Sequence, residues 1–449
     1  MMLVEANVYL RGKTAAIGLR SLVRFTMLAV IPIYCASFQW SYVKWIAPVW
    51  GYLGPRHRSP NPFLLLLAYV LAVLLCVLSP LKLRRPSQVI YWILYFTVYI
   101  PGLFIPLFMQ LDNEFTLLLL ELSLTGGMLL IALSYRIRPA NIRCYPVNRK
   151  MFWTIFYICF VLMNVALLVV FKGSLHFASL EEVYDVRAKA SAVTQQNAGI
   201  GYISTLLGNV MNPFLIAYGL SIHRRKLVAL GTLGQVLVYS TAAMRIILLS
   251  PPLIFLIYYS VKKDRGGWVP KLGLLGSAVF LILTALAAGH DGGIFFTLAS
   301  IIILRTFALP GTFIAHYQYF FENFPHTYLS HIHGVNLFVS DPYSMSLGLE
   351  IGVFYQGVGS LGRIGNANAN FFAMDGIAGF GLPGILLMGV ICAAMFWVLD
   401  GCARKYTVAF SACALTCCAM SLANSSLFTS FLGGGIMLFM LLFLLMPQR

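Results

Sequence analysis

Charged residues are scarce in this chain of 449 residues, and acidic residues are the scarcest of them. Only 10% of the residues are charged, with 14 Asp and Glu against 31 Lys and Arg. Soluble domains carry about 25% charged residues, so the composition excludes an ordinary water-soluble protein. With 60% hydrophobic residues and a mean hydropathy of +0.84, the sequence predicts a polytopic membrane protein.

Signatures of nucleotide, metal and disulfide chemistry are also missing from the sequence. It has no P-loop, GxSxG or HExxH motif and no paired acidic DxD motif. These absences disfavour an ATP-driven pump and a nucleotide-sugar transferase that needs a divalent ion, so we expect no metal and no cofactor. The nine cysteines form no CxxC pair and lie mainly in apolar runs, which argues against a disulfide framework.

Apolar runs long enough to cross about 30 Å of hydrocarbon recur along the whole chain. Most loops between them are short, and no repeat or low-complexity linker divides the chain. We therefore expect an all-α fold with a single transmembrane domain over residues 1–449 and about twelve transmembrane helices. The runs begin near Phe25, Phe63, Gln88, Phe115, Met151, Ile200, Leu227, Ile246, Leu272, Gly381, Tyr406 and Leu427.

The basic residues are distributed unequally between the two sides of these spans. If the N-terminus is cytoplasmic, 22 of the 31 Lys and Arg lie on the cytoplasmic face, as the positive-inside rule requires. Both termini are then cytoplasmic. The net charge of +17 follows from membrane topology, so the lipid bilayer is the expected partner and nucleic acid is not.

The longest predicted loops lie on the outer face, at residues 43–61, 172–199 and 289–380. The last of them, between the ninth and tenth spans, is rich in aromatic and apolar residues and therefore needs to bury them. Short helices on the membrane surface are the expected solution. Pro310, Gly311 and Pro325 are expected to interrupt these helices.

Arg245 stands in "STAAMRIILLSPP", between two spans with almost no loop. A charge at the centre of a membrane helix costs roughly 2.5–3.5 kcal/mol, so such an arginine needs an anionic partner or water. Snorkelling of the side chain to the membrane surface is the alternative interpretation.

Two further arginines, Arg187 and Arg305, lie on the outer loops near predicted membrane boundaries. Guanidinium groups bind phosphate oxygens in a bidentate manner, and several arginines on one cavity suit a pyrophosphate. For each arginine alone, a solvated charge or an ion pair with Asp185 or Asp291 is the alternative.

The large outer loop also contains candidate bases. His331 and His333 have the spacing of two zinc ligands on one side of a strand, but no third ligand follows at a convincing spacing. A histidine with a pKa near 6.5 suits activation of a hydroxyl group, which makes His333 a candidate general base. Three carboxylates of the same loop are rival bases, namely Asp341, Glu350 and Asp375.

Glu121 lies within the fourth predicted span, in "LLLLELSLTGG". A carboxylate inside a membrane is a functional candidate by default, as a proton site or as a partner of an arginine. A protonated, hydrogen-bonded structural residue is the alternative.

The segment "LGRIGNANANFFAMDGIAGFGLPG", residues 361–384, precedes the tenth span. Its asparagines, Asn366, Asn368 and Asn370, offer amide donors and acceptors that suit sugar hydroxyls, and its glycines permit close approach of the backbone. A polar helix cap is the alternative for the asparagines. Irregular backbone at this depth is tolerated where it lines a protein or water cavity.

The same segment resembles the Asn-rich turn before a late transmembrane helix in Wzy-type O-antigen and exopolysaccharide repeat-unit polymerases. "AAMRIILLSPPLIFLIYY" is similar to a tight hairpin of that family, and "YDVRAKA" and "LRTFALPGTF" resemble its two arginine-bearing loops. The spacing of these loops differs, because Gly199 and Gly311 do not follow their arginines at the family's distance.

The resemblance implies a GT-C-like, metal-independent glycosyltransferase in the bacterial inner membrane with its active site facing the periplasm. It implies transfer of a glycan from undecaprenyl pyrophosphate to a sugar hydroxyl of a lipid-linked repeat unit, with a chain-length regulator as protein partner. The implied anion-binding residues are Arg187, Arg245 and Arg305, supported by Arg363. An O-antigen ligase that modifies lipid A core and a lipid-linked oligosaccharide flippase remain alternatives; a flippase is expected to show internal repeats and several intramembrane charges.

Overall fold

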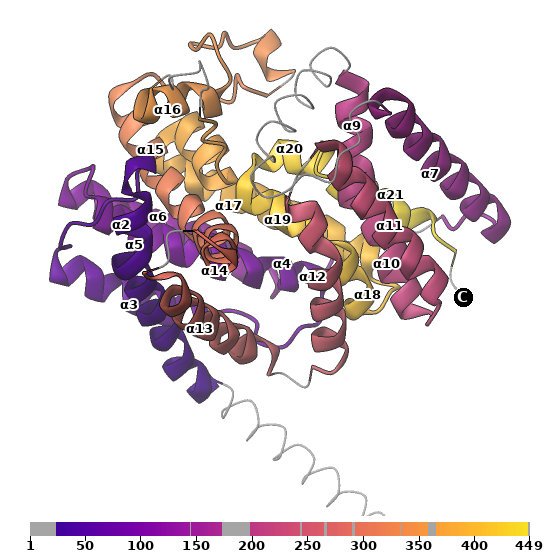
Figure 1. Ribbon diagram of the computed structural model, residues 1–449, viewed down its shortest axis with the longest axis horizontal. Helices are drawn as coiled ribbons and strands as arrows, with labels where there is room; N and C mark the ends of the chain where they lie inside the picture. The colour runs from indigo at the N-terminus through magenta and orange to yellow at the C-terminus, as the bar shows by residue number, and fades with distance from the viewer. Residues whose placement is uncertain are drawn as a thin grey trace, which may run out of the picture.

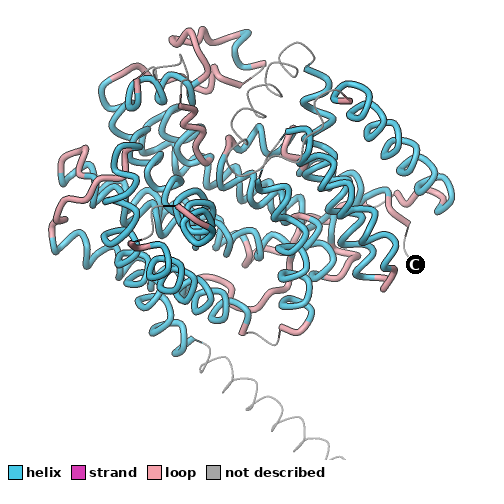
Figure 2. The backbone as a smooth tube through the Cα atoms, viewed as in Figure 1, coloured by secondary structure: helices cyan, strands magenta, loops and turns pink. Residues whose placement is uncertain are grey.

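The computed structural model describes residues 24–143, 145–172, 198–242, 245–264, 267–289, 292–332, 334–357 and 365–447. Within these ranges every regular element is a helix, and no strand is present (Figure 1, Figure 2). An all-helical chain satisfies its backbone hydrogen bonds internally, as a membrane requires. The predicted all-α class is confirmed for the described residues.

The helices follow one another with few long connections. Residues 24–41 form a helix that continues directly into η1, and several later helices contain a π-helical or 3-10 segment, labelled η. The elements after residue 41 are η1 Tyr42–Ile46, α2 Ala47–Trp50, η2 Gly51–Leu53, α3 Pro62–Leu78, α4 Pro86–Leu94, η3 Tyr95–Tyr99, α5 Ile100–Met109, α6 Glu114–Ser134, α7 Arg149–Phe171, α9 Ala198–Leu206, η4 Leu207–Met211, α10 Asn212–Ser221, α11 Arg225–Ala242, α12 Arg245–Lys262, α13 Trp268–Ala287, α14 Ile294–Ala299, η5 Ser300–Ala308, α15 Leu309–Asn323, η6 Val335–Leu337, α16 Leu347–Gln356, η7 Phe372–Ile377, α17 Ala378–Ala403, α18 Val408–Ala414, α19 Thr416–Asn424, α20 Leu427–Leu432 and α21 Ile436–Leu445.

Among the described residues, 8 helices are long and apolar enough to cross a membrane. Two shorter apolar helices, Pro62–Leu78 and Ile247–Lys262, accompany them. The 8 helices are Pro86–Met109, Glu114–Ser134, Arg149–Phe171, Gly199–Ser221, Trp268–Ala287, Ile294–Asn323, Phe372–Ala403 and Leu427–Leu445. These helices support a polytopic membrane protein, whereas the count of twelve spans and the GT-C-like architecture remain predictions.

Several expected spans differ in form from the long helices. The run expected from Tyr406 is divided into α18 and α19, because Leu415 interrupts the helix. Conversely, Ile294–Asn323 lies inside the predicted outer loop 289–380 and is a candidate span. The sequence suggests a helix break at Pro310 and Gly311. In the structure the π-helical segment η5 runs directly into α15, and the helix continues through Pro310.

The candidate spans differ in the fraction of their residues that is buried inside the protein. In the helix Pro86–Met109, 94% of the most apolar stretch is buried inside the protein, against 22% in α7. Figure 1 shows α7 at the edge of the molecule and α4 near its middle. An apolar helix with so little protein cover suits contact with lipid, whereas Pro86–Met109 forms part of the protein core.

Small residues allow the central helices to pack closely. A Cβ atom on Gly389 of α17 would lie 2.7 Å from the carbonyl oxygen of Gly127 in α6. A Cβ on Gly311 of α15 would overlap the carbonyl oxygen of Pro101 in α5. Glycine at such crossings lets helix backbones touch, which is typical of helix packing in membranes.

Two groups of loop contacts lie near the two ends of α17, and we name them the inner and outer ends after the predicted topology. At the inner end, Arg85 donates to the carbonyl oxygens of Tyr135 and Ile137, and Tyr406 donates to that of Met446. The outer end contains residues 54–61, 108–116, 316–346 and 365–378, which are linked by contacts such as that from Thr116 to Glu322. Helix α17 runs from the outer end at Ala378 to the inner end at Ala403.

Candidate active site

A sharp turn between η7 and α17 places Asp375 in the protein interior at the outer end. The short helix η7 leads into α17, whose regular geometry breaks at Phe380 and Gly381, where Gly381 has a φ of 66° and a ψ of −151°. The chain turns so tightly that a Cβ on Gly384 would overlap the carbonyl oxygen of Gly376. The glycines of this segment are therefore needed to fold η7 against the start of α17.

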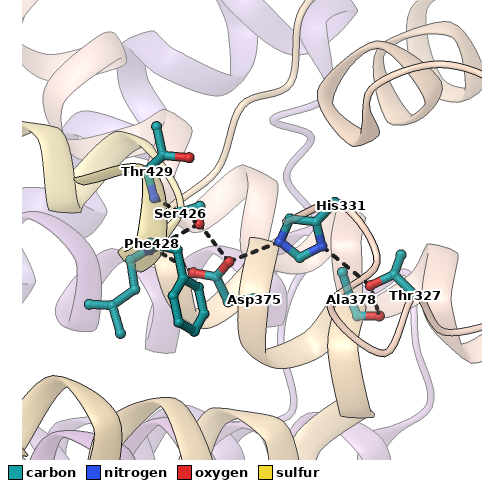
Figure 3. Close-up of polar contacts among 8 residues, drawn as sticks. Thr327, His331, Asp375, Ala378, Ser426, Phe428 and Thr429 are labelled. Carbon is teal, nitrogen blue, oxygen red and sulfur yellow. Dashed lines mark hydrogen bonds and ion pairs between the residues drawn. The ribbon is translucent and has the colours of Figure 1, made fainter. Parts of the chain in front are cut away.

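Asp375 is fully buried and accepts hydrogen bonds from three donors (Figure 3). Its Oδ1 is 2.7 Å from the Ser426 hydroxyl and 3.0 Å from His331 Nε2, and its Oδ2 is 2.6 Å from the backbone nitrogen of Leu427. A buried carboxylate needs such partners, because an unpaired charge in a protein interior is strongly disfavoured. Three segments far apart in the chain thus meet at one carboxyl group.

His331 is held between this carboxylate and Thr327. Its Nε2 contacts Asp375, which favours the tautomer with the proton on Nε2 and leaves a lone pair on Nδ1. The Thr327 hydroxyl lies 3.5 Å from Nδ1 but directs its only proton to the carbonyl oxygen of Ala378, at 3.1 Å. Nδ1 therefore has no strong donor, and 9% of the His331 side chain remains exposed.

A histidine oriented by a buried carboxylate is a recurring general base. The carboxylate fixes the imidazole tautomer and stabilises the imidazolium ion that forms when Nδ1 takes a proton. Ser426 and the backbone nitrogen of Leu427 hold the carboxylate in place at the start of α20. The arrangement is therefore competent to activate a hydroxyl group that approaches Nδ1.

The Asn-rich segment leads directly into this turn. Asn366 and Asn368 are exposed and lie on the same side of an extended stretch, while Ala367 and Ala369 between them are buried. Asn370 is fully buried, accepts from the backbone nitrogens of Phe372 and Ala373, and donates to the carbonyl oxygen of Pro310. Its amide caps η7. Asn366 and Asn368 are exposed, but their amide oxygens lie against Gly348 of α16, and that of Asn366 accepts from the backbone nitrogen of Asn368.

The other two carboxylates weighed as bases have local roles. Asp341 is exposed and accepts from the backbone nitrogen of Tyr343, two residues later. Glu350 accepts from the backbone nitrogen of Met345 and the hydroxyl of Ser344, just before α16. Both contacts shape the loop to which each carboxylate belongs.

Most of the predicted anion-binding groups fall beyond the described residues. Arg187 and Arg363 lie outside them, as does His333, and Arg245 begins α12 but its side chain is not among the described ones. Arg305 lies on η5 and is partly buried. The arginine cluster therefore remains a prediction, with only Arg305 placed in full.

Glu121 is buried in α6, and neither of its carboxyl oxygens has a hydrogen-bond partner among the described residues. A hydroxyl near it, that of Thr125, donates to the Glu121 backbone carbonyl and not to the carboxyl group. A buried carboxyl group without a donor is stable only in the neutral form. The side chain is thus better placed to hold a proton than to balance an arginine.

A second acidic contact lies at the outer end. Asp112 and Glu322 face each other, and Glu322 also accepts from Thr116. Burial, and then the neighbouring Glu322 carboxyl group, raise the pKa of Asp112 to about 8. No hydrogen-bond donor reaches the Asp112 oxygens within the described part of the chain, which favours the protonated form of Asp112. Asp112 borders a cavity of about 500 Å³ that is also lined by Asn61, Gln110 and Glu114.

The sequence did not single out His331 as a base or Ser426 at all. His331 was considered with His333 as a metal ligand, and the described residues contain no group of three potential ligands that could hold a metal ion. Ser426 caps α20 by accepting from the backbone nitrogens of Phe428 and Thr429, and a serine just before an apolar run is the sequence signal for such a cap. Its contact with Asp375 has no signal in the sequence.

Comparisons of the chain with protein-family models, with curated proteins and with solved structures find no match.

Proposed function

We propose that this protein is a metal-independent glycosyltransferase of the bacterial inner membrane that joins lipid-linked oligosaccharide repeat units at the outer face. The donor is a glycan on undecaprenyl pyrophosphate, and the acceptor is a sugar hydroxyl of a repeat unit on the same lipid. The proposal joins the resemblance to Wzy-type polymerases with one observation, the His331–Asp375 pair at the outer end. A chain-length regulator is its proposed protein partner.

The proposed step is a displacement at the anomeric carbon of the donor. The acceptor oxygen bonds to that carbon, the bond from the carbon to the pyrophosphate oxygen breaks, and its electron pair leaves with the pyrophosphate. The hydroxyl proton passes to Nδ1 of His331, and Asp375 stabilises the resulting imidazolium. Positioned arginines neutralise the charge on the leaving pyrophosphate, and Arg305 is the described residue proposed for this role.

Polar groups near this turn suit the sugar part of the substrate. Asn366 and Asn368 offer exposed amides that can donate to and accept from hydroxyl groups. The cavity beside Asp112 is lined by amide and carboxyl side chains, which also form hydrogen bonds with hydroxyl groups. We propose Asn366 and Asn368 as sugar-binding residues. Asn370 has a structural role, because its side chain caps η7.

Two other activities use a similar substrate. An O-antigen ligase shares the donor and the base and differs in its acceptor, lipid A core. A lipid-linked oligosaccharide flippase moves the substrate without bond formation, and the buried, unpartnered Glu121 is the feature that favours it. A base oriented by a buried carboxylate has no use in passive movement of a lipid, so we favour transfer.

Product length in vitro tests the proposal. Purified protein is incubated with one homogeneous undecaprenyl-pyrophosphate repeat unit, without metal or nucleotide, and the products are resolved by mass spectrometry. A ladder of products supports the polymerase. Extension only after addition of lipid A core identifies a ligase instead, and unextended substrate that crosses a liposome membrane identifies a flippase.

A further inference from the structure

A cavity at the inner end is lined by none of the residues of the candidate active site. Its volume is about 750 Å³, within the range of roughly 300–1,000 Å³ typical of ligand sites. It opens where the last turns of α10 and α12, the turn before α18 and residues 446–447 come together. With Leu83, five chain segments thus form its walls, and none belongs to the outer end.

The cavity is lined by two cations and one acidic residue. The ammonium groups of Lys262 and Lys405 border it, and both side chains are exposed. Lys262 Nζ lies 5.4 Å from the centre of the Tyr258 ring, a cation–π contact that directs the side chain along the cavity wall. The one acidic residue in the lining, Asp264, accepts from the backbone nitrogen of Trp268 and so caps the next helix.

Two of the three tyrosines of the lining are held in place by backbone groups. The Tyr258 hydroxyl donates to the carbonyl oxygen of Leu220, and the Tyr406 hydroxyl donates to that of Met446. The hydroxyl protons of these two are therefore committed, and the lysines are the cationic donors that border the cavity. Two ammonium groups on one cavity are suited to an anion with several oxygen atoms, such as a phosphate.

The remaining wall is apolar and lies next to membrane helices. Leu83, Phe410 and Met446 contribute to it, and the candidate spans ending at Ser221 and Leu445 reach the same region. A free phosphate ion gains nothing from such a wall, whereas a phospholipid places its glycerol and first acyl carbons against apolar side chains. Basic pockets between helices on the cytoplasmic side are suited to anionic lipid headgroups.

We infer that this inner-end cavity binds the phosphate headgroup of an anionic phospholipid, with Lys262 and Lys405 as its cationic contacts. The site is separate from the proposed transfer reaction, and its existence does not depend on that reaction. The bound lipid joins the ends of α10, α12 and α18, so it stabilises the contacts among them. Phosphatidylglycerol is a suitable probe because it carries one phosphate and no cation.

The test measures lipid binding by the full chain. Purified protein in a neutral detergent is titrated with phosphatidylglycerol, with phosphatidylcholine and with inorganic phosphate, and its thermal unfolding temperature is recorded. Phosphatidylglycerol is expected to raise this temperature with saturation, and the other two probes are not. Changing Lys262 and Lys405 to Gln is expected to raise the half-saturating concentration about tenfold or more, since each basic residue near an anionic headgroup contributes about 1 kcal/mol.

The matched control changes Lys263 and Lys271 to Gln. These lysines are exposed, lie beside the same loop and do not line the cavity, so the control removes the same charge. Its half-saturating concentration is expected to stay within about twofold of the wild type, given the small effect of exposed charges. An equal loss in both double variants, or an equal response to phosphatidylcholine or to inorganic phosphate, would overturn the inference. Because all four lysines are exposed, unfolding without lipid is expected to be unchanged, which is checked in the same experiment.

Discussion

Two buried aspartates lie at opposite ends of the same bent transmembrane segment, and they differ in one partner. Asp400, at the inner end, accepts from the backbone nitrogen and the hydroxyl of Ser87, at 3.2 and 2.6 Å. Asp375, at the outer end, accepts from a serine hydroxyl and a backbone nitrogen in the same way, but it also contacts His331. Both are almost completely buried.

The contacts that Asp375 and Asp400 have in common are structural. A serine at the start of a neighbouring helix, together with a backbone N–H, satisfies the carboxylate and attaches the helix to it. The added imidazole at Asp375 has no role in that attachment, because the carboxylate is already satisfied. Asp400 is therefore a control for Asp375. A comparison of the two separates the effect of a buried aspartate on stability from the proposed effect of Asp375 on the transfer rate.

The largest expected difference between the two aspartates is in activity. Asp375→Asn leaves an amide that no longer stabilises an imidazolium, so the transfer rate is expected to fall by about 10²–10⁴, the range for loss of general-base catalysis. Asp400→Asn is expected to keep the rate within about threefold of the wild type for the same amount of folded protein. Rates of product formation from a lipid-linked repeat unit measure both. Equal losses in the two variants would contradict a chemical role for Asp375.

The turn that carries Asp375 is expected to be sensitive to added volume. In Gly384→Ala the new Cβ overlaps the carbonyl oxygen of Gly376, so the backbone has to shift at a cost of about 3 kcal/mol, near the upper end of overpacking effects. Gly433→Ala is the control, because its Cβ lies 3.4 Å from the nearest atom. Thermal unfolding in detergent compares them, and equal unfolding temperatures would show that the turn is looser than described.

Both serines are expected to contribute to stability, Ser426 more than Ser87. Ser426→Ala and Ser87→Ala each remove one hydroxyl donor from a buried carboxylate, which costs about 1.5–3 kcal/mol. Ser426→Ala also removes the cap of α20, so its decrease in unfolding temperature is expected to be the larger. A much smaller decrease for Ser426→Ala would mean that His331 alone holds Asp375, and the parallel between the two sites would fail.

A pH-dependent effect is expected at Asp112, a partly buried aspartate whose neighbour is another acid. With a pKa of about 8 against an ordinary 3.8, it keeps a proton in the folded protein over a pH range in which the unfolded chain has lost it. The folded state then binds more protons than the unfolded state, so stability falls as the pH rises from about 4 to 8. Asp112→Asn is expected to remove this slope.

Unfolding temperatures measured across that pH range test this expectation. The control is Asp341→Asn, because Asp341 is exposed and its side chain contacts only its own loop. The control is expected to retain the wild-type slope. A slope unchanged in Asp112→Asn would assign the pH dependence to other groups.

The sequence predicted the helical class, because this class depends on local patterns. Long apolar runs identified the spans, and the polar, glycine-rich character of residues 361–384 indicated unusual backbone near Asp375. Of the three alternating asparagines, Asn366 and Asn368 are exposed, whereas Asn370 is buried and caps a helix.

The ranking of the candidate bases could not be predicted, because it depends on contacts between distant segments. His331 and Ser426 are 44 and 51 residues from Asp375 along the chain, and no spacing in the sequence connects them. Asp341 and Glu350 look equivalent to Asp375 in the sequence, and only their local backbone contacts distinguish them. The length of Ile294–Asn323 could not be predicted, because Pro310 lies within this helix and does not end it.

Chemical rescue of His331→Ala tests the central claim most directly. The rate of a single transfer is measured for the folded variant with and without added imidazole, beside Asp400→Asn as the structural control. The account predicts a rate about 10²–10⁴ below wild type, a partial recovery with imidazole, and no response to imidazole in the control. A His331→Ala rate within about twofold of the wild type would contradict the account.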